Sequence, residues 1–209
     1  DIFILGWSGQ LDPDRAMTLT PQTTEAMHRD TVYLTVVDRD RMAVSLIYST
    51  YWSFGSGIAS PRFGILFQNR GAGFTLQNGH PNEAGPGKRP LHTIIPAMLK
   101  RDGRVVMPFG VMGGAYQPAG HARLVSNMLD HSMDPQEALD APRCFATEGA
   151  LKIERGYTDA VRTELAQMGH RIEVPDSPLG GGQAIVIDAA RGILTGASDP
   201  RKDGCALGY

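Results

Sequence analysis

The stretch "HRDTVYLTVVDRD", residues 28–40, changes character at Thr31. The charged pair Arg29–Asp30 precedes a run of β-branched and aromatic residues, which is typical of a β-strand. One interpretation is that Asp30 closes a loop and Thr31 opens the strand. The other is that Thr31 is a latent N-terminus, a nucleophile that cleavage of the Asp30–Thr31 bond would release. The rest of the chain has to decide between them.

Composition sets broad limits. The chain has 209 residues, of which 42% are hydrophobic and 20% charged, as expected for one globular domain with its own core. A net charge of −2 predicts no nucleic-acid or anionic-membrane partner. No apolar run approaches the ~18 residues of a transmembrane helix. The two cysteines, Cys144 and Cys205, form no disulfide framework and favour a reducing, cytoplasmic location, while a periplasmic or secreted one stays open.

Residues 1–30 differ from the rest of the chain. They are polar, rich in turn residues and poorly periodic, so we expect a linker or tail there and a catalytic domain over 31–209. The chain begins with Asp and lacks the basic and apolar segments of a signal peptide. We therefore expect the natural N-terminus to lie upstream.

From Thr31 onward the pattern predicts strands, then helices, then strands. The predicted elements are strands at 31–38, 42–51 and 63–69, two strands within 93–111 around Asp102–Gly103, helices at 117–133, 134–142 and 158–170, a strand at 151–157, and two strands within 182–201. This order favours an α+β fold over βαβ alternation.

The predicted helices carry their own start and stop signals. Asp134 and Pro135 suit the first turn of one helix, and Thr158 suits the N-cap of the next. The apolar residues that share one face of the helix at 117–133 are Ala122, Val125, Met128 and Leu129.

Two features could supply acyl-transfer chemistry. A Thr at a chain terminus can attack through its hydroxyl while its α-amine, with a pKa of about 7.7–8.0, accepts the proton. Gly113 and Gly114 follow a strand pattern and precede a helix, and consecutive glycines allow two N–H groups to point at one oxyanion. In isolation each has a simpler interpretation, a strand residue and a tight turn.

Other polar motifs are less specific. His92 and Thr93 lie where a glycine-rich loop meets an apolar run, a common place for ligand contacts. Asp199, before Pro200, is interpreted as part of a stiff structural turn. No HExxH or phosphate-loop motif is present, so we predict no metal and no cofactor. His121 and His131 are interpreted as surface residues of a helix.

The order of motifs carries more information than any one of them. The pieces are "DTVYLTVVDRD", "AVS" with "FGSGI", "GILFQN", "PGKRPLHTIIPAM", "GVMGGA", "ALDAPR", "LKIERG", "GASDPR" and the final "GY". Together they cover 31–209, and this part of the chain resembles the small-subunit half of the γ-glutamyltransferase family of N-terminal-nucleophile hydrolases.

The resemblance implies an αββα sandwich and autoproteolysis between Asp30 and Thr31. Thr31 would be the nucleophile, with its own α-amine as base. Ser49 matches the family hydroxyl that hydrogen-bonds to the nucleophile, and Gly113 and Gly114 match the N–H donors to the oxyanion. The implied reaction is two-step acyl transfer from a small-molecule amide.

The predicted substrate-binding positions depart from those of the glutathione-degrading members. Tyr51, Arg70 and Gly73 stand where such enzymes recognise the α-amino group with carboxylate and amide side chains, and His92 and Thr93 replace two serines that bind the α-carboxylate. A buried ammonium without a carboxylate partner is costly. Arg70 and His92 would suit a carboxylate-bearing acyl group, as in the acylase-like and oxamate amidohydrolase-like branch.

The resemblance also implies a partner, a large subunit cut from the same precursor, which would form a heterodimer with this chain and supply much of the sandwich. Two alternatives stay open. The protein could be a true γ-glutamyltransferase, or glutathione hydrolase, with a remodelled pocket, or it could be a non-catalytic binding subunit.

Overall fold

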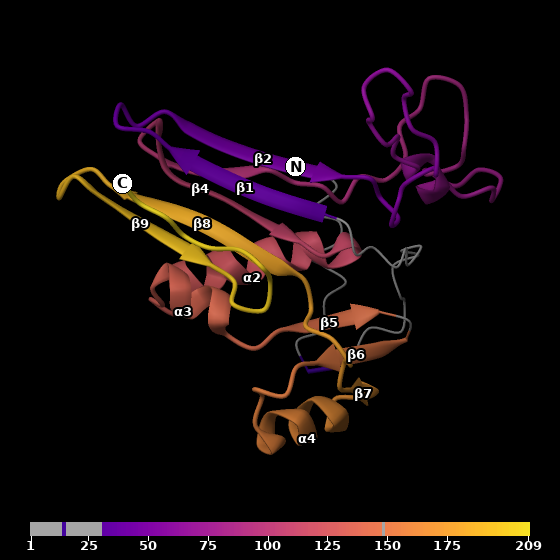
Figure 1. Cartoon of the computed structure of the whole chain (residues 1–209). Helices are drawn as coiled ribbons and strands as arrows, with labels where there is room; N and C mark the ends of the chain where they lie inside the picture. Colours follow the sequence, from indigo (N-terminus) through magenta and orange to yellow (C-terminus); the bar gives the residue numbers. More distant parts are fainter. Residues whose placement is uncertain (1–13, 16–30, 148) are drawn as a thin grey trace. The chain divides into compact units, whose positions relative to one another are not determined.

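The computed structural model describes residues 14–15, 31–147 and 149–209 (Figure 1). The predicted tail at 1–30 therefore lies almost wholly outside the described residues. The described chain mixes helices and strands, and it divides into two compact units. The larger contains 31–141 and 180–209, and the smaller contains 142–179.

The larger unit holds most of the secondary structure. Its strands are β1 (Thr31–Val37), β2 (Ala43–Ser49), β3 (Ala97–Arg101), β4 (Arg104–Met112), β8 (Gly181–Asp188) and β9 (Ile193–Ser198). Its helices are α2 (Gln117–Leu129), α3 (Pro135–Asp140) and the short 3-10 turns η1 (Arg70–Gly73) and η2 (Gly114–Tyr116).

Three layers form the body of this unit. Strands β3, β4, β8 and β9 form one antiparallel sheet in the order β3-β4-β8-β9. Helices α2 and α3 cover one face of it, and the antiparallel pair β1–β2 covers the other (Figure 1). The core between helices and sheet consists of Met107, Phe109, Leu124, Ala138, Leu139, Ala184 and Ala197. The helix–sheet–sheet order is three of the four layers predicted from the resemblance.

The β1–β2 hairpin forms as its sequence predicts. Alternate residues of both strands point inward, and Thr31 pairs directly with Ser49 at the open end of the ladder. The turn is closed by Asp38, whose carboxylate accepts the backbone N–H of Met42 at 2.8 Å.

The predicted hairpin at 93–111 is also confirmed. Asp102 and Gly103 have φ angles of 51° and 76°, both in the left-handed region that a two-residue hairpin turn needs. Glycine adopts a positive φ without strain, which suits it to the second position. β3 begins only at Ala97, directly after Pro96, which has no N–H to donate to a ladder.

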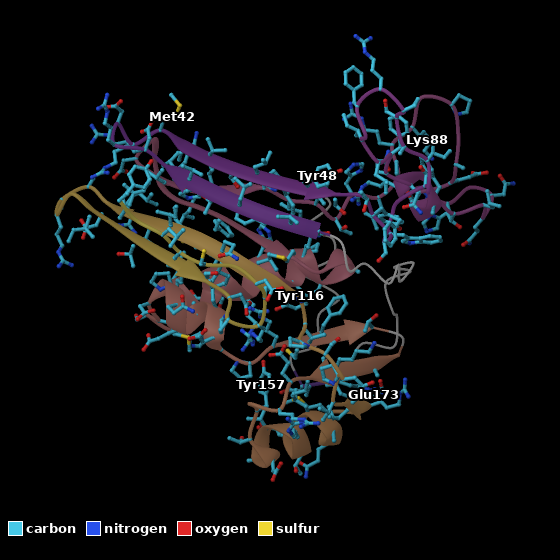
Figure 2. All side chains as sticks on the ribbon, viewed as in Figure 1. Met42, Tyr48, Lys88, Tyr116, Tyr157 and Glu173 are labelled. Atoms are coloured by element: carbon cyan, nitrogen blue, oxygen red, sulfur yellow. The ribbon has the colours of Figure 1, made fainter. Side chains whose placement is uncertain are left out.

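The outward face of β1–β2 is apolar and exposed. Val32, Leu34, Val36, Val44, Leu46 and Tyr48 are each between 42% and 58% exposed. These residues pair across the hairpin, so they form one continuous strip, which we call the outer strip. Figure 2 shows Tyr48 at one end of this ribbon and Met42 at its turn. No helix covers the outer strip in the described residues.

The "ASDPR" turn has the structural role predicted for it. Asp199 is fully buried, and its carboxylate accepts the side-chain Nε–H of Arg201 at 2.9 Å and the backbone N–H of Gly182 at 3.2 Å. Arg201 also donates to the carbonyl oxygen of Leu139. One buried ion pair thus joins β8, the end of β9 and helix α3.

The smaller unit is a separate helix-and-sheet body. It contains β5 (Cys144–Thr147), β6 (Ala150–Ile153), helix α4 (Asp159–Gln167) and β7 (Ile172–Glu173). β6 and β7 run parallel, with α4 as the crossover between them, so this unit contains one βαβ pair that the sequence pattern did not predict. The predicted N-cap holds, because Thr158 Oγ1 accepts the backbone N–H of Val161 at 3.4 Å.

Several element predictions need correction, including the strand predicted to reach 157, which ends at Ile153, and the helix predicted to reach 170, which ends at Gln167. Residues 63–69 form no strand: Gly64 has a φ of 65°, and the backbone bonds of this run go to the neighbouring loop at Ile58 and Ser60. Helix α2 ends at Leu129 and not at 133. Strands β5 and β7 were missed, because short segments carry too little periodicity. No helix in the described residues has the length and apolarity to cross a bilayer.

Candidate active site

Thr31 occupies the first position of β1, opposite the last residue of β2. Its Oγ1 hydroxyl donates a hydrogen bond to Ser49 Oγ at 3.2 Å. Ser49 Oγ also accepts the backbone N–H of Tyr51 at 3.1 Å, which fixes the serine from its far side. The predicted nucleophile and the predicted tuning hydroxyl are therefore in contact. Asp30, the other half of the predicted cleavage bond, lies outside the described residues.

The side chain of Thr31 faces the four-stranded sheet. It shares a strand face with Tyr33, whose ring is buried against Gly110 of β4. β1 begins at the same end of the layers where β4 ends (Figure 1). The predicted oxyanion donors Gly113 and Gly114 directly follow the end of β4. The fold thus brings Thr31 and the two glycines to one end of the sandwich.

The two glycines have backbone conformations that side chains disfavour. Gly113 and Gly114 have φ angles of 130° and 60°. A Cβ atom at Gly113 would come within 2.6 Å of Gly180 Cα, so the chain segments touch backbone to backbone. Tyr116, which Figure 2 places beside the start of α2, packs against Gly180 as well. This packing fixes the turn whose N–H groups would face an oxyanion.

Three predicted substrate-binding positions form one cluster. The guanidinium carbon of Arg70 lies 4.9 Å from the centroid of the Tyr51 ring. A Cβ atom at Gly73 would come 3.0 Å from the Tyr51 hydroxyl oxygen, so a larger residue there would press against the Tyr51 side chain. Tyr51 is in turn bonded to Ser49, which connects the cluster to Thr31.

Arg70 has an unusual environment for a cation. It is only 5% exposed, and its Nη1 atom has no hydrogen-bond partner in the part of the chain that the structure describes. Burial lowers the pKa of Arg70, while the neighbouring Tyr51 acts in the opposite direction. Burial likewise raises the pKa of the Tyr51 phenol. A buried guanidinium N–H without an acceptor is a ready partner for a carboxylate.

Two asparagines that the sequence did not single out hold the cluster in place. Asn69 Oδ1 accepts the backbone N–H of Trp52 at 3.1 Å. Asn82 Nδ2 donates to the carbonyl oxygen of Gly73 at 2.6 Å, and its Oδ1 accepts the N–H of Leu91 at 2.9 Å. Asn82 therefore joins Gly73 to the loop that leads to His92. Turn-forming asparagines are common, and nothing in their spacing marks these two.

The contacts of His92 and Thr93 are with other residues than those of the Arg70 cluster. His92 is exposed, and its Nδ1 lies 3.0 Å from the carbonyl oxygen of Pro90, so Nδ1 carries the proton and donates it. Thr93 is half-buried, and its carbonyl oxygen receives the side-chain amide of Gln117 at 2.6 Å. The structure gives no direct contact between either residue and Arg70.

The interpretation of His121 as a surface residue is wrong, whereas His131 is exposed as expected. His121 is half-buried, and its ring packs 5.1 Å from the Phe109 ring. Its Nε2 accepts the backbone N–H of Val111 at 3.2 Å. Burial lowers the pKa of His121 from its ordinary 6.5 to about 4, so the imidazole is neutral near pH 7.

Among the described residues, no group of three His, Cys, Asp or Glu side chains is placed to hold a metal ion. The site consists instead of a hydroxyl pair, a glycine turn and a buried guanidinium. These groups can position a nucleophile, stabilise an oxyanion and bind an anion.

Solved structures share this arrangement of layers. A γ-glutamyltranspeptidase from Pseudomonas nitroreducens, complexed with L-DON, covers 85% of this chain and 98% of its own, with a TM-score of 0.76 and 28% identity. A cephalosporin acylase from Bacillus halodurans covers 100% of this chain and 39% of its own, with a TM-score of 0.85 and 38% identity. The fold is thus that of the small-subunit part of an N-terminal-nucleophile hydrolase.

The sequence gives the family. The gamma-glutamyltranspeptidase family model matches residues 7–209, and the chain belongs to that family, as the motif order predicts. The glutathione hydrolase-like YwrD proenzyme of Bacillus subtilis is 37% identical over 97% of this chain and 40% of its own length. The oxamate amidohydrolase proenzyme of Klebsiella pneumoniae is 39% identical over 86% of this chain and 36% of its own. The chain spans about two fifths of these relatives.

Proposed function

We propose that this chain is the nucleophile-bearing part of an autoprocessing amidohydrolase or acyltransferase that works through an acyl-Thr31 intermediate. The hydrogen bond from Thr31 Oγ1 to Ser49 Oγ, at the first residue of β1, is the observation that carries the proposal. A threonine at the head of a paired strand can become a chain terminus without loss of its ladder.

The first step creates the catalytic base. In the uncut chain the nitrogen of Thr31 is part of a peptide bond and cannot accept a proton. Attack of the Thr31 hydroxyl on the Asp30 carbonyl would break the C–N bond and leave an ester. Water then hydrolyses the ester, which leaves a carboxylate on Asp30 and a free amine on Thr31.

The mature site would then cleave an amide in two steps. The Thr31 amine takes the hydroxyl proton as Oγ1 attacks the substrate carbonyl, and N–H groups of the Gly113–Gly114 turn stabilise the oxyanion. The amine product leaves with a proton from the Thr31 ammonium, and the acyl group stays on Oγ1. Water or an acceptor amine attacks the ester and restores Thr31.

Arg70 supports a carboxylate-bearing acyl group as the substrate class. Among the described residues, its Nη1 is the one buried guanidinium Nη without a hydrogen-bond partner. Arg70 lies beside Tyr51, which is linked through Ser49 to the proposed nucleophile. A substrate carboxylate would satisfy that N–H group and bring a compensating charge. A γ-glutamyl ammonium, in contrast, would meet a guanidinium of the same sign. The name of the oxamate amidohydrolase relative agrees with this preference.

The outer strip supports a partner in the active protein. Its exposed apolar side chains match the face that a fourth, helical layer covers in an αββα sandwich. The relatives are named as proenzymes and are longer than this chain by more than half of their length. We infer that a large subunit from the same precursor covers the outer strip after cleavage.

The intact mass of the full-length precursor tests the nucleophile. After incubation at neutral pH we expect two fragments, the smaller beginning at Thr31. Thr31→Ala should leave one uncut chain, and Thr31→Ser should still cut. Thr35→Ala is a matched control from the same strand, since the Thr35 hydroxyl donates to the carbonyl oxygen of Val44 in the hairpin and has no bond to Ser49. Cleavage of the Thr31→Ala precursor would contradict the proposal.

A substrate comparison separates the alternatives. The mature protein should turn over oxamate or glutaryl amides faster than γ-glutamyl-p-nitroanilide. Faster turnover of the γ-glutamyl compound would instead identify a true γ-glutamyltransferase with a remodelled pocket. A wild-type precursor that stays uncut and turns over none of these amides would identify a non-catalytic binding subunit.

A further inference from the structure

The last residues of β4 lack a strand partner on one side. The ladder between β3 and β4 ends at the pair Ala97 and Phe109. Pro96, directly before Ala97, cannot donate an N–H group, and β3 goes no further. Val111 lies two residues beyond Phe109 and two before Gly113, so its N–H and carbonyl on that side need other partners.

Helix α2 supplies those partners from two side chains one turn apart. His121 Nε2 accepts the N–H of Val111 at 3.2 Å. The side-chain amide of Gln117 lies against two carbonyl oxygens, those of Val111 at 3.1 Å and Thr93 at 2.6 Å. Because both neighbours can only accept, the amide is assigned with its nitrogen toward them, and it donates to both. We call this pair of side chains the Gln117–His121 clasp.

The clasp replaces a strand. His121 Nε2, the acceptor, takes the place that the C=O of a β3 residue would occupy beside Val111, and the Gln117 amide, the donor, takes the place of its N–H. Gln117 also reaches the segment before β3, so one side chain connects Thr93, a predicted substrate-binding position, to the strand that leads into Gly113–Gly114. Gln117 thus joins the predicted substrate-binding segment at Thr93 to the strand end that leads into the predicted oxyanion turn.

Burial makes this connection stiff. Gln117 is fully buried. Between the two clasp residues, Gly120 lets the helix approach the sheet closely, since a Cβ atom there would come 2.7 Å from the Val111 side chain. An apolar side chain at 117 would leave the carbonyl oxygens of Val111 and Thr93 without this donor, which is unfavourable for buried polar groups.

We propose that Gln117 and His121 are positioning residues for the reaction, holding the end of β4 and the Thr93 segment so that the Gly113–Gly114 turn keeps its oxyanion-binding geometry. The clasp itself follows from the contacts, whereas its catalytic part rests on the proposed function. Neither side chain needs to touch the substrate. A small displacement of an oxyanion donor lowers turnover strongly, because the donor must point at the charge that develops.

The test uses the mature, processed protein. Gln117→Met keeps the length of the side chain and removes the amide. His121→Leu removes the acceptor, while His121→Gln can keep one through its Oε1 atom. His131→Leu is the matched control, because it removes an exposed imidazole just beyond the end of the same helix. For each variant, kcat and KM are measured for one amide, and hydrogen exchange is followed at the Val111 amide.

We expect kcat to fall about tenfold to a hundredfold in His121→Leu and Gln117→Met, with KM changing less in His121→Leu. Exchange at Val111 should accelerate at least about tenfold in His121→Leu, and His121→Gln should restore both quantities to within about threefold. His131→Leu should change neither. The His121 pair decides the matter if Gln117→Met does not fold.

Three results would overturn the proposal, each in a different way. Faster exchange at Val111 with an unchanged kcat shows a clasp without a positioning role. Unchanged exchange in His121→Leu shows that the clasp does not hold Val111. A wild-type precursor that is not cleaved at Thr31 and turns over no amide overturns both the proposed function and the positioning role of the clasp. Hydrogen exchange at Val111 still shows whether the clasp holds the end of β4.

Discussion

Tyr33 of β1 lies directly over Gly110 of β4, so closely that a Cβ atom at Gly110 would come 2.3 Å from the tyrosine ring. The Tyr33 hydroxyl lies 2.8 Å from Ser45 Oγ, and Ser45 in turn donates to the carbonyl oxygen of Phe109 at 3.4 Å. These contacts fix the two sheets against each other two residues from Thr31. The position of Thr31, the proposed nucleophile, therefore depends on a glycine in the neighbouring layer.

Gly110→Ala should destabilise the protein by about 1–3 kcal/mol, because the added methyl group overlaps the Tyr33 ring. Denaturant unfolding of the full-length protein measures this change. Gly208→Ala, where a Cβ atom would meet no atom within 4 Å, is the control and should leave stability unchanged. In a double-mutant cycle, Tyr33→Ala should reduce the cost of Gly110→Ala. Independent, additive effects would contradict the contact.

Ser49→Ala should lower kcat by about tenfold, since Thr31 Oγ1 loses the one hydrogen bond that holds it toward β2. Ser49→Thr keeps the hydroxyl and should recover most of the activity. Steady-state kinetics of the mature protein, with the extent of cleavage checked by mass, measures the effect. Equal activity of Ser49→Ala and wild type would show that the Thr31–Ser49 bond has no part in the reaction.

Arg70→Met should raise KM by about tenfold or more for an amide whose acyl group ends in a carboxylate, because a charged hydrogen bond is lost. The methyl ester of the same amide should show no such change. Arg62→Met is the matched control, as Arg62 also lies over an aromatic ring, 5.0 Å from the Phe63 centroid, but is exposed. A loss of the same size for acid and ester would rule out carboxylate recognition by Arg70.

Acid should weaken the fold through His121. Its pKa is lowered to about 4 in the folded protein against an ordinary 6.5, so the folded state binds the proton less well than the unfolded state. The stability that neutral His121 contributes is complete above about pH 6.5 and is lost as the pH falls toward 4. Unfolding measured across this range should be less pH-dependent in His121→Gln than in wild type. His131→Gln should follow the wild-type curve.

Asp199→Ala should destabilise the protein by about 3–5 kcal/mol, since it leaves the Arg201 guanidinium, largely buried, without its carboxylate. Asp188→Ala should change stability by less than about 1 kcal/mol, because its ion pair with Arg191 is 4.0 Å long and largely exposed. Thermal unfolding of both variants gives the comparison. Similar losses at the two positions would contradict a special role for Asp199.

The parts of the fold that could be predicted from the sequence are those with local signals. Alternation and a short turn predict the β1–β2 hairpin, and Asp102–Gly103 predicts the next hairpin. The capping box of α3 is visible as Asp134 and Glu137, whose side chains each accept the other's backbone N–H. In each case the residues that cause the structure lie within a few positions of one another.

Helix α2 shows why other parts could not be predicted. The pattern grouped Ala122 and Leu129 on one apolar face with Val125 and Met128, yet only Val125 and Met128 pack against the core, while Ala122 and Leu129 are exposed. The helix instead buries Gln117 and Asn127, whose amides find backbone carbonyls in distant segments. Hydrophobicity ranks such residues as polar and outward, because the partners that make their burial favourable are absent from the local sequence.

In the candidate site, too, the contacts that depend on local sequence could be predicted, and the long-range contacts could not. Thr31 and Ser49 meet because a hairpin of given turn length fixes their register, so the pairing follows from the sequence once the turn is placed. The burial of Arg70 and the bonds of Asn82 depend on how the loop between β2 and β3 folds back on itself. That loop has few periodic signals, and its contacts became visible only in the structure.

The outer strip has a practical consequence for anyone who produces this chain by itself. In the described part of the chain β1 and β2 form a two-stranded sheet, so each strand has one edge without a strand partner. These edges lie beside the exposed apolar surface of the outer strip. Such a ribbon can lengthen by adding strands from other copies. The concentration of the chain, more than the temperature, would then decide whether it stays in solution. Co-expression with the proposed large subunit should counter this association.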